Sequence, residues 1–366
     1  MAIPFLDLKA QYASIKPEIE AAVTGVLDSC GFIGGENLKR FERNFAAYMG
    51  AKHAVGSCSG TSALHLALMG AGVKKGDEVI TAVNTFIATT EAITHAGATP
   101  VLVDVDEATQ LIDPARIEAA ITPKTTCIVP VHLYGQPADM DAVRDIAKRR
   151  GLKVVADAAQ SHGSAIDGDR KKTLGDTTAT SFYPGKNLGA AGDAGAVLTD
   201  NEETAVFMRA LGDHGSKEKY HHQYEGWNYR LDAMQAAILD VKLKHLDTWT
   251  AARRAHAARY NKAFAGSNVI PIQAAPGRTH VYHLYVVRVP DRDRTMARLK
   301  EKGIGVGIHY PVPLHLQPAY AHLGLKKGTF PVAEKVIPHI ISLPMYAELT
   351  DAMIDEAAAA VIDAAK

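Results

Sequence analysis

The sequence predicts an α/β fold, in which a mostly parallel sheet is covered by helices, followed by a smaller α+β region. From about residue 53 to about residue 200, short runs rich in β-branched residues alternate with segments that carry apolar residues at helical spacing. Near-continuous apolar strands separated by helices are typical of a parallel sheet that is buried on both faces. Further along, the pattern changes to an alternating strand and short helices, which indicates a second domain.

The β-branched runs predict the strands of one sheet. These runs are residues 53–58, 77–83, 99–105, 125–133, 152–157, 177–183 and 195–199. Between them, apolar spacing predicts helices at 61–70 and 138–150. Before the first strand we expect two more helices, at 16–29 and 36–50, joined by the segment GFIGG.

The C-terminal third begins with a helical pattern in which apolar and aromatic residues step by three or four positions. This spacing predicts one long helix from about 232 to 263. After it we expect a strand at 281–289, a helix at 295–303, a second strand at 305–310, a proline-rich segment and an alanine-rich terminal helix. We therefore predict a large domain over 1–249 and a small domain over 250–366.

Composition excludes several classes of partner. The chain has 366 residues, of which 47% are hydrophobic, and its 40 Lys+Arg balance its 40 Asp+Glu. A net charge of zero gives no basic field for nucleic acid or an anionic membrane. Three cysteines without CxxC spacing favour neither disulfides nor a thiolate zinc site, and no apolar run approaches the length of a membrane span. We expect an untargeted cytoplasmic protein.

Residues that follow the strands are the candidates for chemistry, because ligands of open parallel sheets bind beyond the carboxyl ends of the strands. A predicted helix begins at Ser59, Gly60 and Thr61. Either its unpaired N–H groups bind an anion, or Ser59 is a simple N-cap. Asp157 ends a strand, with Gln160 three residues on. Asp157 is either a helix-cap or turn residue, or its carboxylate is the partner of a cationic nitrogen.

Lys186 lies after a Pro-Gly turn, between a predicted strand and a run of Gly and Ala. The segment lacks the GxxxxGK[ST] pattern of a phosphate-gripping loop. An amine in a desolvated strand-end position is suited to forming a Schiff base with a carbonyl, whereas an ordinary loop lysine is the plain alternative. Ser181 precedes it, and Phe86 ends another strand, where its ring either joins the core or stacks on a planar ligand.

These features together are the parts that bind pyridoxal phosphate. The helix start takes the phosphate, the carboxylate keeps the pyridine nitrogen protonated, and the lysine holds the aldehyde. The histidines at 214, 221 and 222 lack a carboxylate or cysteine at a known ligand spacing, so we expect no metal site.

The chain resembles the DegT/StrS family of nucleotide-sugar aminotransferases. The segments that carry the resemblance are GT (60–61), TFIAT (85–89), HLYG (132–135), DAAQSHG (157–163), SFYPGKNLGAAGDAGA (181–196), GWNYRLDAMQAAIL (226–239), HYPVPLHLQPAY (309–320) and SLPM (342–345). They cover nearly the whole chain in the order of the family. The resemblance implies the pyridoxal-phosphate transferase fold of type I, with a seven-stranded sheet, and a homodimer with shared active sites.

The resemblance also implies roles for single residues. Lys186 matches the Schiff-base lysine, Asp157 the partner of the pyridine nitrogen and Gln160 a contact to the ring hydroxyl. Further matches are Gly60, Thr61 and Ser181 to the phosphate, Phe86 stacked on the ring, Asn228 reaching the phosphate from the neighbouring subunit, and His309, Tyr310 and Arg230 near the substrate. Many relatives have Tyr and Gly where this chain has Ala191 and Ala194, so we expect a different pocket edge.

The implied reaction moves an amino group from L-glutamate to a nucleotide-linked keto sugar. The 309–320 segment is most similar to enzymes that aminate the sugar 3-position, so we favour a dTDP-3-oxo-6-deoxyhexose, as in deoxyamino sugar or lipopolysaccharide O-antigen synthesis. A UDP-linked 3-oxo uronate and a 4-keto-6-deoxy sugar are alternatives. Related dehydratases have histidine at the position of the Schiff-base lysine. The presence of Lys186 therefore argues against dehydratase chemistry. A phosphate-binding regulator without catalysis is the alternative from another class.

Overall fold

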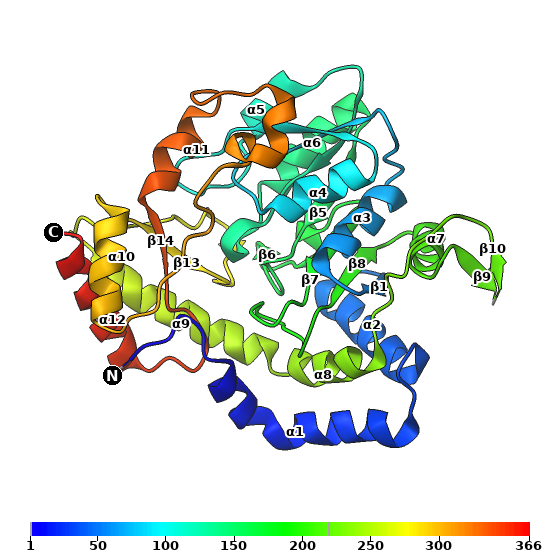
Figure 1. Cartoon of the computed structure of the whole chain (residues 1–366), viewed down its shortest axis with the longest axis horizontal. Coiled ribbons are helices and arrows are strands. Elements are labelled where there is room, and N and C mark those ends of the chain that lie inside the picture. The colour runs from blue at the N-terminus through cyan, green and yellow to red at the C-terminus, as the bar shows by residue number, and fades with distance from the viewer. Residues whose placement is uncertain (1, 219) are drawn as a thin grey trace.

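The computed structural model describes residues 2–218 and 220–366. Figure 1 shows a large α/β part, which contains the main sheet, and a C-terminal part beside it, where both chain ends lie. Two long helices, α8 and α9, run below the sheet and connect the two parts. Among the described residues, no helix is long and apolar enough to cross a membrane.

The main sheet has seven strands in the order β1-β8-β7-β5-β4-β2-β3. The strands are β1 (His53–Ser57), β2 (Glu78–Ala82), β3 (Thr99–Val103), β4 (Thr125–Val129), β5 (Lys153–Asp157), β7 (Thr177–Ser181) and β8 (Gly195–Thr199). All neighbours pair in parallel except β8, which runs antiparallel to both β7 and β1. The predicted mostly parallel, seven-stranded α/β sheet is confirmed.

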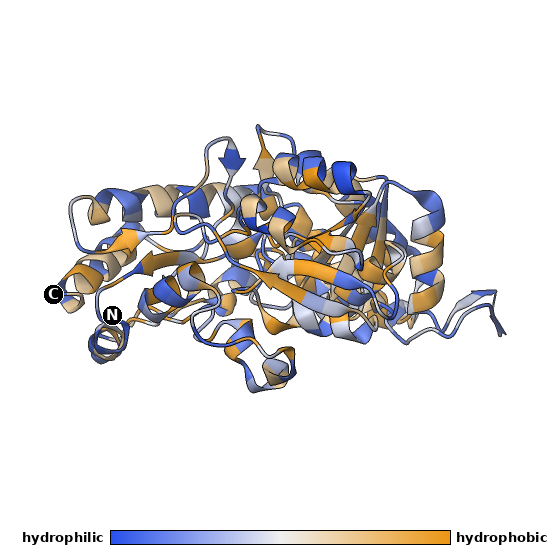
Figure 2. Ribbon diagram, turned by 90° about the horizontal axis from the view of Figure 1, so that it is seen from above, coloured by the Kyte–Doolittle hydropathy of each residue, from blue (hydrophilic) through white to orange (hydrophobic). Residues whose placement is uncertain are grey.

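Helices cover both faces of this sheet, because successive strand residues point to opposite sides. Val79 and Cys127 pack in the core that also holds α3 and α4, whereas Ile80 and Ile128 pack in the core that holds α5 and α6. The helices are α3 (Gly60–Gly70), α4 (Ile87–His95), α5 (Pro114–Ala120), α6 (Met140–Arg150) and α7 (Glu202–Gly212). In Figure 2 the strands are largely hydrophobic, and hydrophilic residues alternate along the outer helices.

Two helices precede the sheet, α1 (Leu8–Ser29) and α2 (Gly35–Met49), as the sequence predicts. The first begins earlier than expected, since the side chain of Asp7 accepts a hydrogen bond from the backbone N–H of Ala10 and caps it. Asp240 joins α2 to the later helix α8, because its carboxylate accepts hydrogen bonds from Arg40 and Asn44.

The single helix predicted at 232–263 is wrong. The structure has α8 (Ala233–Leu243) and α9 (Leu246–Phe264), separated by Lys244 and His245. The N–H groups of these two residues bond three positions back, to Val241 and Lys242, which tightens the turn and redirects the chain. α8 packs against α1 and α2, whereas α9 packs against the terminal helix α12 (Asp351–Ala364). Different partners on the two sides of the break explain why one periodic pattern gives two helices.

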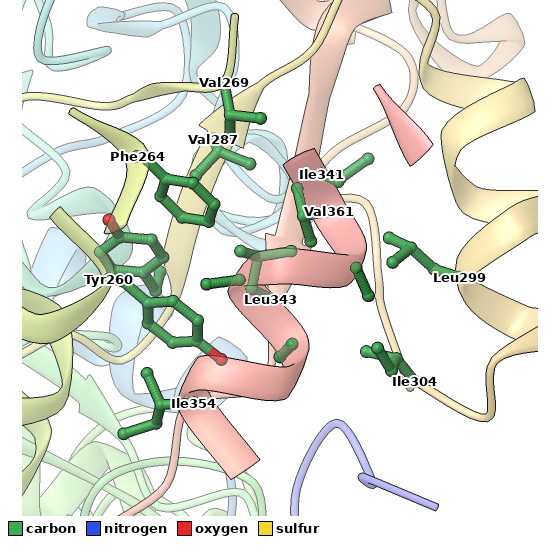
Figure 3. Packing of buried hydrophobic residues seen from close by; sticks show 14 of the residues in the cluster. Tyr260, Phe264, Val269, Val287, Leu299, Ile304, Ile341, Leu343, Ile354 and Val361 are labelled. Carbon is green, nitrogen blue, oxygen red and sulfur yellow. The ribbon is translucent and has the colours of Figure 1, made fainter. Parts of the chain in front are cut away.

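The C-terminal part contains a three-stranded antiparallel sheet in the order β11-β13-β14, with β11 (Ile270–Pro271), β13 (Tyr285–Arg288) and β14 (Ile340–Leu343). Figure 3 shows its core, in which Tyr260 and Phe264 of α9, Val287 of β13 and Leu343 of β14 pack with Val361 of α12. The helix α10 (Arg292–Glu301) contributes Leu299 to the same core.

The strand predicted at 305–310 is wrong. The strand that pairs with β13 is β14, and within the stretch only Gly307 forms an isolated bridge, to Ser342. Gly305 lies against the N-terminal segment, since a Cβ there would come 2.5 Å from the backbone nitrogen of Phe5. Close packing against a distant part of the chain replaces a regular ladder.

Shorter elements complete the structure. These are β6 (Ala165–Ile166), β9 (Ser216–Glu218), β10 (His221–His222), β12 (Arg278–Thr279), α11 (Pro331–Val336) and the 3-10 turns η1 (Leu133–Gly135), η2 (Lys171–Thr173), η3 (Leu314–Leu316), η4 (Pro318–Leu323) and η5 (Ile337–His339). The pair β9–β10 extends away from the rest of the molecule (Figures 1 and 2). The predicted domain boundary at 249/250 falls inside α9, and the division itself stays a prediction.

Candidate active site

A cavity of about 510 Å³ lies at the carboxyl ends of the parallel strands. The sequence-predicted residues that line it are Gly60, Thr61, Phe86, Asp157, Gln160, Ser181, Lys186, His309 and Tyr310. They come from segments that are far apart in the sequence, and the parallel sheet brings them to one edge. The last two belong to the C-terminal part, so the cavity lies where that part meets the main sheet.

Lys186 and Asp157 face the same cavity from neighbouring strands. Lys186 follows β7, in the connection to β8, and its backbone N–H donates to the carbonyl of Tyr183. Burial lowers the pKa of the Lys186 amine to about 8, although the carboxylate of Asp157 acts in the opposite direction. Burial is also the main influence on Asp157 and raises its pKa. A lysine whose pKa is near 8 supplies far more neutral amine at physiological pH than a solvated lysine does.

Asp157 is held at both carboxylate oxygens. It ends β5 and is 4% exposed. The hydroxyl of Thr89 donates to Oδ2 at 2.8 Å, and the backbone N–H of Ala159 donates to Oδ1 at 3.1 Å. These contacts fix the carboxylate in the cavity wall, aimed at whatever cationic group enters.

The start of α3 presents two unpaired N–H groups at the cavity. Ser59 caps the helix through a capping box, in which its side chain accepts from the N–H of Ser62 and the hydroxyl of Ser62 accepts from the N–H of Ser59. Within the described residues, the N–H groups of Gly60 and Thr61 have no hydrogen-bond acceptor. A Cβ on Gly60 would lie 2.5 Å from the Cβ of Ser181, so glycine allows this close approach. The capping interpretation is therefore confirmed, and anion binding by the free N–H groups stays a prediction.

Planar and polar side chains complete the wall. Phe86 is 51% exposed, and its ring centroid lies 5.3 Å from that of Tyr310. The amide of Gln160 accepts from the backbone N–H of Tyr134 at 2.6 Å and donates to the hydroxyl of Tyr310 at 3.1 Å. His309 contacts the hydroxyl of Ser342 and stacks on Phe5, and burial lowers its pKa to about 4.

Two predicted residues lie outside this cavity. Asn228 forms a backbone bridge with Asp213, and Arg230 makes an ion pair of 2.6 Å with the same aspartate. Neither lines the pocket formed by its own chain.

Sequence reasoning missed several residues of the site. Thr89, Tyr183, Asp193 and His283 line the cavity without having been singled out. Thr89 lies four residues after Thr85 in the TFIATT segment, so helical spacing could have found it. His283 lay inside a predicted alternating strand and gave no local signal. Its Nδ1 is buried without a partner among the described residues, and burial lowers its pKa well below the usual value.

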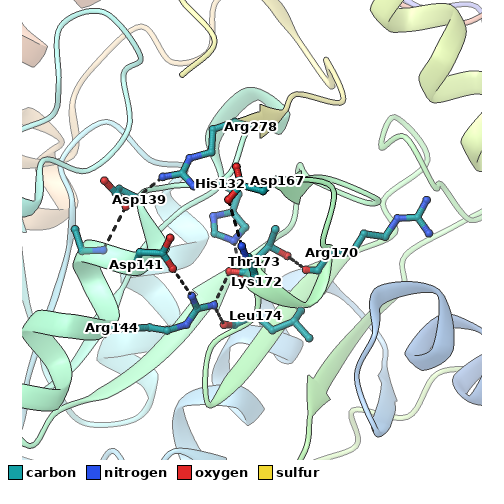
Figure 4. A network of polar contacts seen from close by, with 11 residues as sticks. His132, Asp139, Asp141, Arg144, Asp167, Arg170, Lys172, Thr173, Leu174 and Arg278 are labelled. Carbon is teal, nitrogen blue, oxygen red and sulfur yellow. Dashed lines mark hydrogen bonds and ion pairs between the residues drawn. The ribbon is translucent and has the colours of Figure 1, made fainter. Parts of the chain in front are cut away.

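The histidine of the HLYG segment is structural. The Nδ1 atom of His132 accepts from the N–H of Ala138, so the other ring nitrogen, Nε2, donates to the carbonyl of Thr173. Burial lowers its pKa to about 4 and keeps it neutral. Figure 4 shows this contact beside Arg144, which donates to the carbonyls of Lys172 and Leu174.

Other candidate sites give no comparable chemistry. A surface depression of about 840 Å³ lies beside Arg144, but the lysines 171 and 172 on its rim are paired with Asp200 and Asp167. Over residues 2–218 and 220–366, no cluster of three His, Cys, Asp or Glu side chains could hold a metal ion.

Known structures share this fold. The crystal structure of Streptomyces venezuelae DesV in complex with a ketimine intermediate is 46% identical, with a TM-score of 0.97, and the match covers 100% of this chain and 99% of that one. The structure of NtdA from Bacillus subtilis with bound cofactor PMP is 34% identical, with a TM-score of 0.91, over 99% of this chain and 85% of that one. The fold is that of the aminotransferases.

Sequence comparison identifies the family. A model of the DegT/DnrJ/EryC1/StrS aminotransferase family matches residues 13–362, and the chain belongs to this family. A pleiotropic regulatory protein of Geobacillus stearothermophilus is 50% identical (96% of this chain, 95% of the relative). A dTDP-3-amino-3,4,6-trideoxy-α-D-glucose transaminase of Streptomyces venezuelae is 48% identical (94% and 91%). A UDP-2-acetamido-2-deoxy-3-oxo-D-glucuronate aminotransferase of Pseudomonas aeruginosa is 41% identical (96% and 97%).

Proposed function

We propose that this protein transfers an amino group from L-glutamate to the 3-position of a nucleotide-linked keto sugar, with a dTDP-3-oxo-6-deoxyhexose as the favoured acceptor. The observation that carries the proposal is that Lys186 and Asp157 line one cavity beside an unpaired helix start. The family and the transaminase relatives support the reaction class. A UDP-linked 3-oxo uronate and a 4-keto-6-deoxy sugar are the alternative acceptors.

The residues of the cavity fit pyridoxal phosphate. We propose that the N–H groups of Gly60 and Thr61 and the hydroxyl of Ser181 hold its phosphate, and that Phe86 stacks on its ring. Asp157 would pair with the ring nitrogen, Gln160 would contact the ring hydroxyl, and Lys186 would hold the aldehyde. When bound, the cofactor supplies an electron sink for the carbanion formed at the donor carbon.

The chain's own contribution is proton transfer and orientation. The Nζ atom of Lys186 would move a proton from the α-carbon of glutamate to the cofactor carbon that carried the aldehyde, because its lowered pKa leaves it partly neutral near pH 8. In the acceptor half of the cycle it would move a proton from that carbon to the sugar carbon that receives the nitrogen. Asp157 would hold the proton on the ring nitrogen, and Thr89 and Ala159 hold Asp157 in place.

His309 and Tyr310 are proposed to contact the sugar nucleotide. Both line the cavity from the C-terminal part, together with Lys186 and Asp157 from the main sheet. The transaminase relatives act at the sugar 3-position with either a dTDP or a UDP carrier by name, which supports the sugar position more than the nucleotide.

We further propose a cytoplasmic homodimer with shared active sites. Asn228 and Arg230 lie outside their own cavity, on the segment that leads from the extended β9–β10 pair toward α8. From there they would reach the cavity of a second copy, where the amide of Asn228 adds a phosphate contact.

The proposal is tested by absorbance and product mass. The purified protein, loaded with pyridoxal phosphate, should be yellow, and L-glutamate should bleach it. Nucleotide-linked 3-keto and 4-keto sugars should then restore the colour, each to the extent that it is an acceptor. Product mass separates an aminotransferase from a dehydratase, because only the first gains nitrogen. A protein that stays colourless with added cofactor would leave the regulator as the better account.

A further inference from the structure

Tyr134 lies behind the wall of the cavity and joins three of the segments that form it. The residue follows β4 in the turn η1 and is 2% exposed. It does not line the cavity itself. Its backbone has a φ of 62°, in the left-handed region that a tyrosine rarely adopts, so its neighbours must hold it there.

Each polar atom of Tyr134 serves a different segment. Its N–H donates to Oε1 of Gln160 at 2.6 Å, and its carbonyl accepts from the N–H of Leu284 at 3.2 Å. Its hydroxyl donates to the carbonyl of His309 at 2.7 Å. Gln160, Leu284 and His309 all line the cavity. One buried residue therefore connects the strand-end wall with the wall from the C-terminal part.

The hydroxyl contact matters because the stretch around His309 lacks a regular strand. Among the described residues, no other donor reaches the carbonyl of His309. Tyr310, the next residue, is held by its hydroxyl contact with Gln160 and by its ring contact with Phe86. Loss of the Tyr134 hydroxyl would leave the partly buried carbonyl of His309 without its donor and would loosen this stretch.

We propose that Tyr134 is a positioning residue that sets the acceptor-facing wall, His309 and Tyr310, relative to the cofactor-facing amide of Gln160. The expected change in kinetics, but not the structural role of Tyr134, rests on the proposed function. Tyr134→Phe removes only the hydroxyl and leaves the backbone contact with Gln160 intact. Contacts of Lys186 and Asp157 do not involve Tyr134. Tyr134→Phe should therefore weaken the reaction with the keto-sugar acceptor and leave the rate of the glutamate half-reaction nearly unchanged.

The matched control is Tyr285→Phe. Tyr285 is also 2% exposed, and its hydroxyl donates to Oδ1 of Asn261 at 2.6 Å, in the core of the C-terminal part and away from the cavity. Both variants lose one partly buried hydrogen bond, so a general loss of stability should be similar in the two. Melting curves measure that loss.

Two readouts decide the proposal. In hydrogen–deuterium exchange, amides of residues 305–316 should exchange several-fold faster in Tyr134→Phe than in wild type or Tyr285→Phe. In kinetics, KM for the keto-sugar nucleotide should rise about fivefold in Tyr134→Phe, whereas the rate of bleaching by glutamate should change less than about twofold. Unchanged exchange at 305–316, or equal changes in both halves of the reaction, would overturn it. If wild type aminates no sugar, the proposed function fails, and the exchange experiment still decides the role of Tyr134.

Discussion

The hydroxyl of Thr89 donates a hydrogen bond of 2.8 Å to Oδ2 of Asp157, although 68 positions separate the two residues in the sequence. The threonine lies in the first turns of α4, and the aspartate ends β5. Thr89 also contacts the hydroxyl of Thr85 at 3.0 Å. This chain of hydroxyls sets the direction in which the carboxylate faces the cavity.

Asp157→Asn should therefore retain the fold and lose the reaction. The asparagine oxygen can accept from Ala159 while its amide donates to Thr89, whose own hydroxyl then donates to Thr85. Without the negative charge, kcat/KM should fall about 100-fold or more. The rate at which L-glutamate bleaches the yellow protein measures this loss.

A buried carboxylate elsewhere controls for that substitution. Asp104 is 7% exposed and accepts from the N–H groups of Val332 and Ala333, outside the cavity. Asp104→Asn should lower the melting temperature while changing kcat/KM less than about tenfold. Comparable losses of activity in both variants would contradict a specific role for Asp157.

Covalent capture of the cofactor should occur at Lys186 and not at Lys242. Burial lowers the pKa of both amines to about 8, but Lys242 donates to the carbonyl of Gly189 and does not line the cavity. After loading with pyridoxal phosphate, borohydride reduction and peptide mapping should find the label on Lys186. Lys186→Ala should give no label and no yellow colour. A label on Lys242 of comparable yield would mean that amine pKa alone directs the chemistry.

The loading rate should depend on pH in a way that reflects the pKa of Lys186. Only the neutral amine attacks an aldehyde, so the rate should rise about tenfold per pH unit below the pKa and level off above it. Because burial lowers the pKa from 10.5 to about 8, the plateau should begin near pH 8. Stopped-flow mixing of cofactor-free protein with pyridoxal phosphate between pH 6 and 10 measures this profile. A rate that still climbs steeply at pH 10 would show an ordinary solvated lysine.

Gly60→Ala should weaken cofactor binding at least about tenfold, a cost of about 1.4 kcal/mol. The added Cβ would lie 2.5 Å from the Cβ of Ser181 and must displace one side of the phosphate cradle. Gly25→Ala in α1 is the control, since a Cβ there meets nothing within 4 Å. That variant should bind the cofactor normally and gain up to about 1 kcal/mol of stability from helix propensity. Absorbance titration gives both affinities, and equal affinities would remove Gly60 from the cradle.

Shared sites predict complementation between two inactive chains. If Asn228 acts across the interface, every mixed dimer in a mixture of Lys186→Ala and Asn228→Ala subunits contains one cavity with both residues intact. Such a mixture should recover up to about a quarter of wild-type activity if subunits exchange at random and Asn228 acts across the interface. Native mass spectrometry establishes the exchange. If exchange is complete and activity stays at the level of the parents, Asn228 acts within its own chain or not at all.

Local patterns determined the main sheet and identified the candidate residues of the site. The strands around Val79 and Cys127 are continuous apolar runs in the sequence, because helices cover both faces of the sheet. Burial on both faces can therefore be recognised within each run. Asp157, Ser181 and Lys186 were identifiable because they follow such runs, and the topology of a parallel sheet places all strand ends together.

Only the tertiary structure decided which distant segments meet. The break between α8 and α9 depends on two different packing partners, and the pairing of β13 with β14 instead of 305–310 depends on how the N-terminal segment covers Gly305. Tyr134 and Thr89 act through side-chain contacts with residues far along the chain. Helical and strand periodicity reports which face of an element is buried, whereas the partner that buries it is set by the packing of the whole molecule.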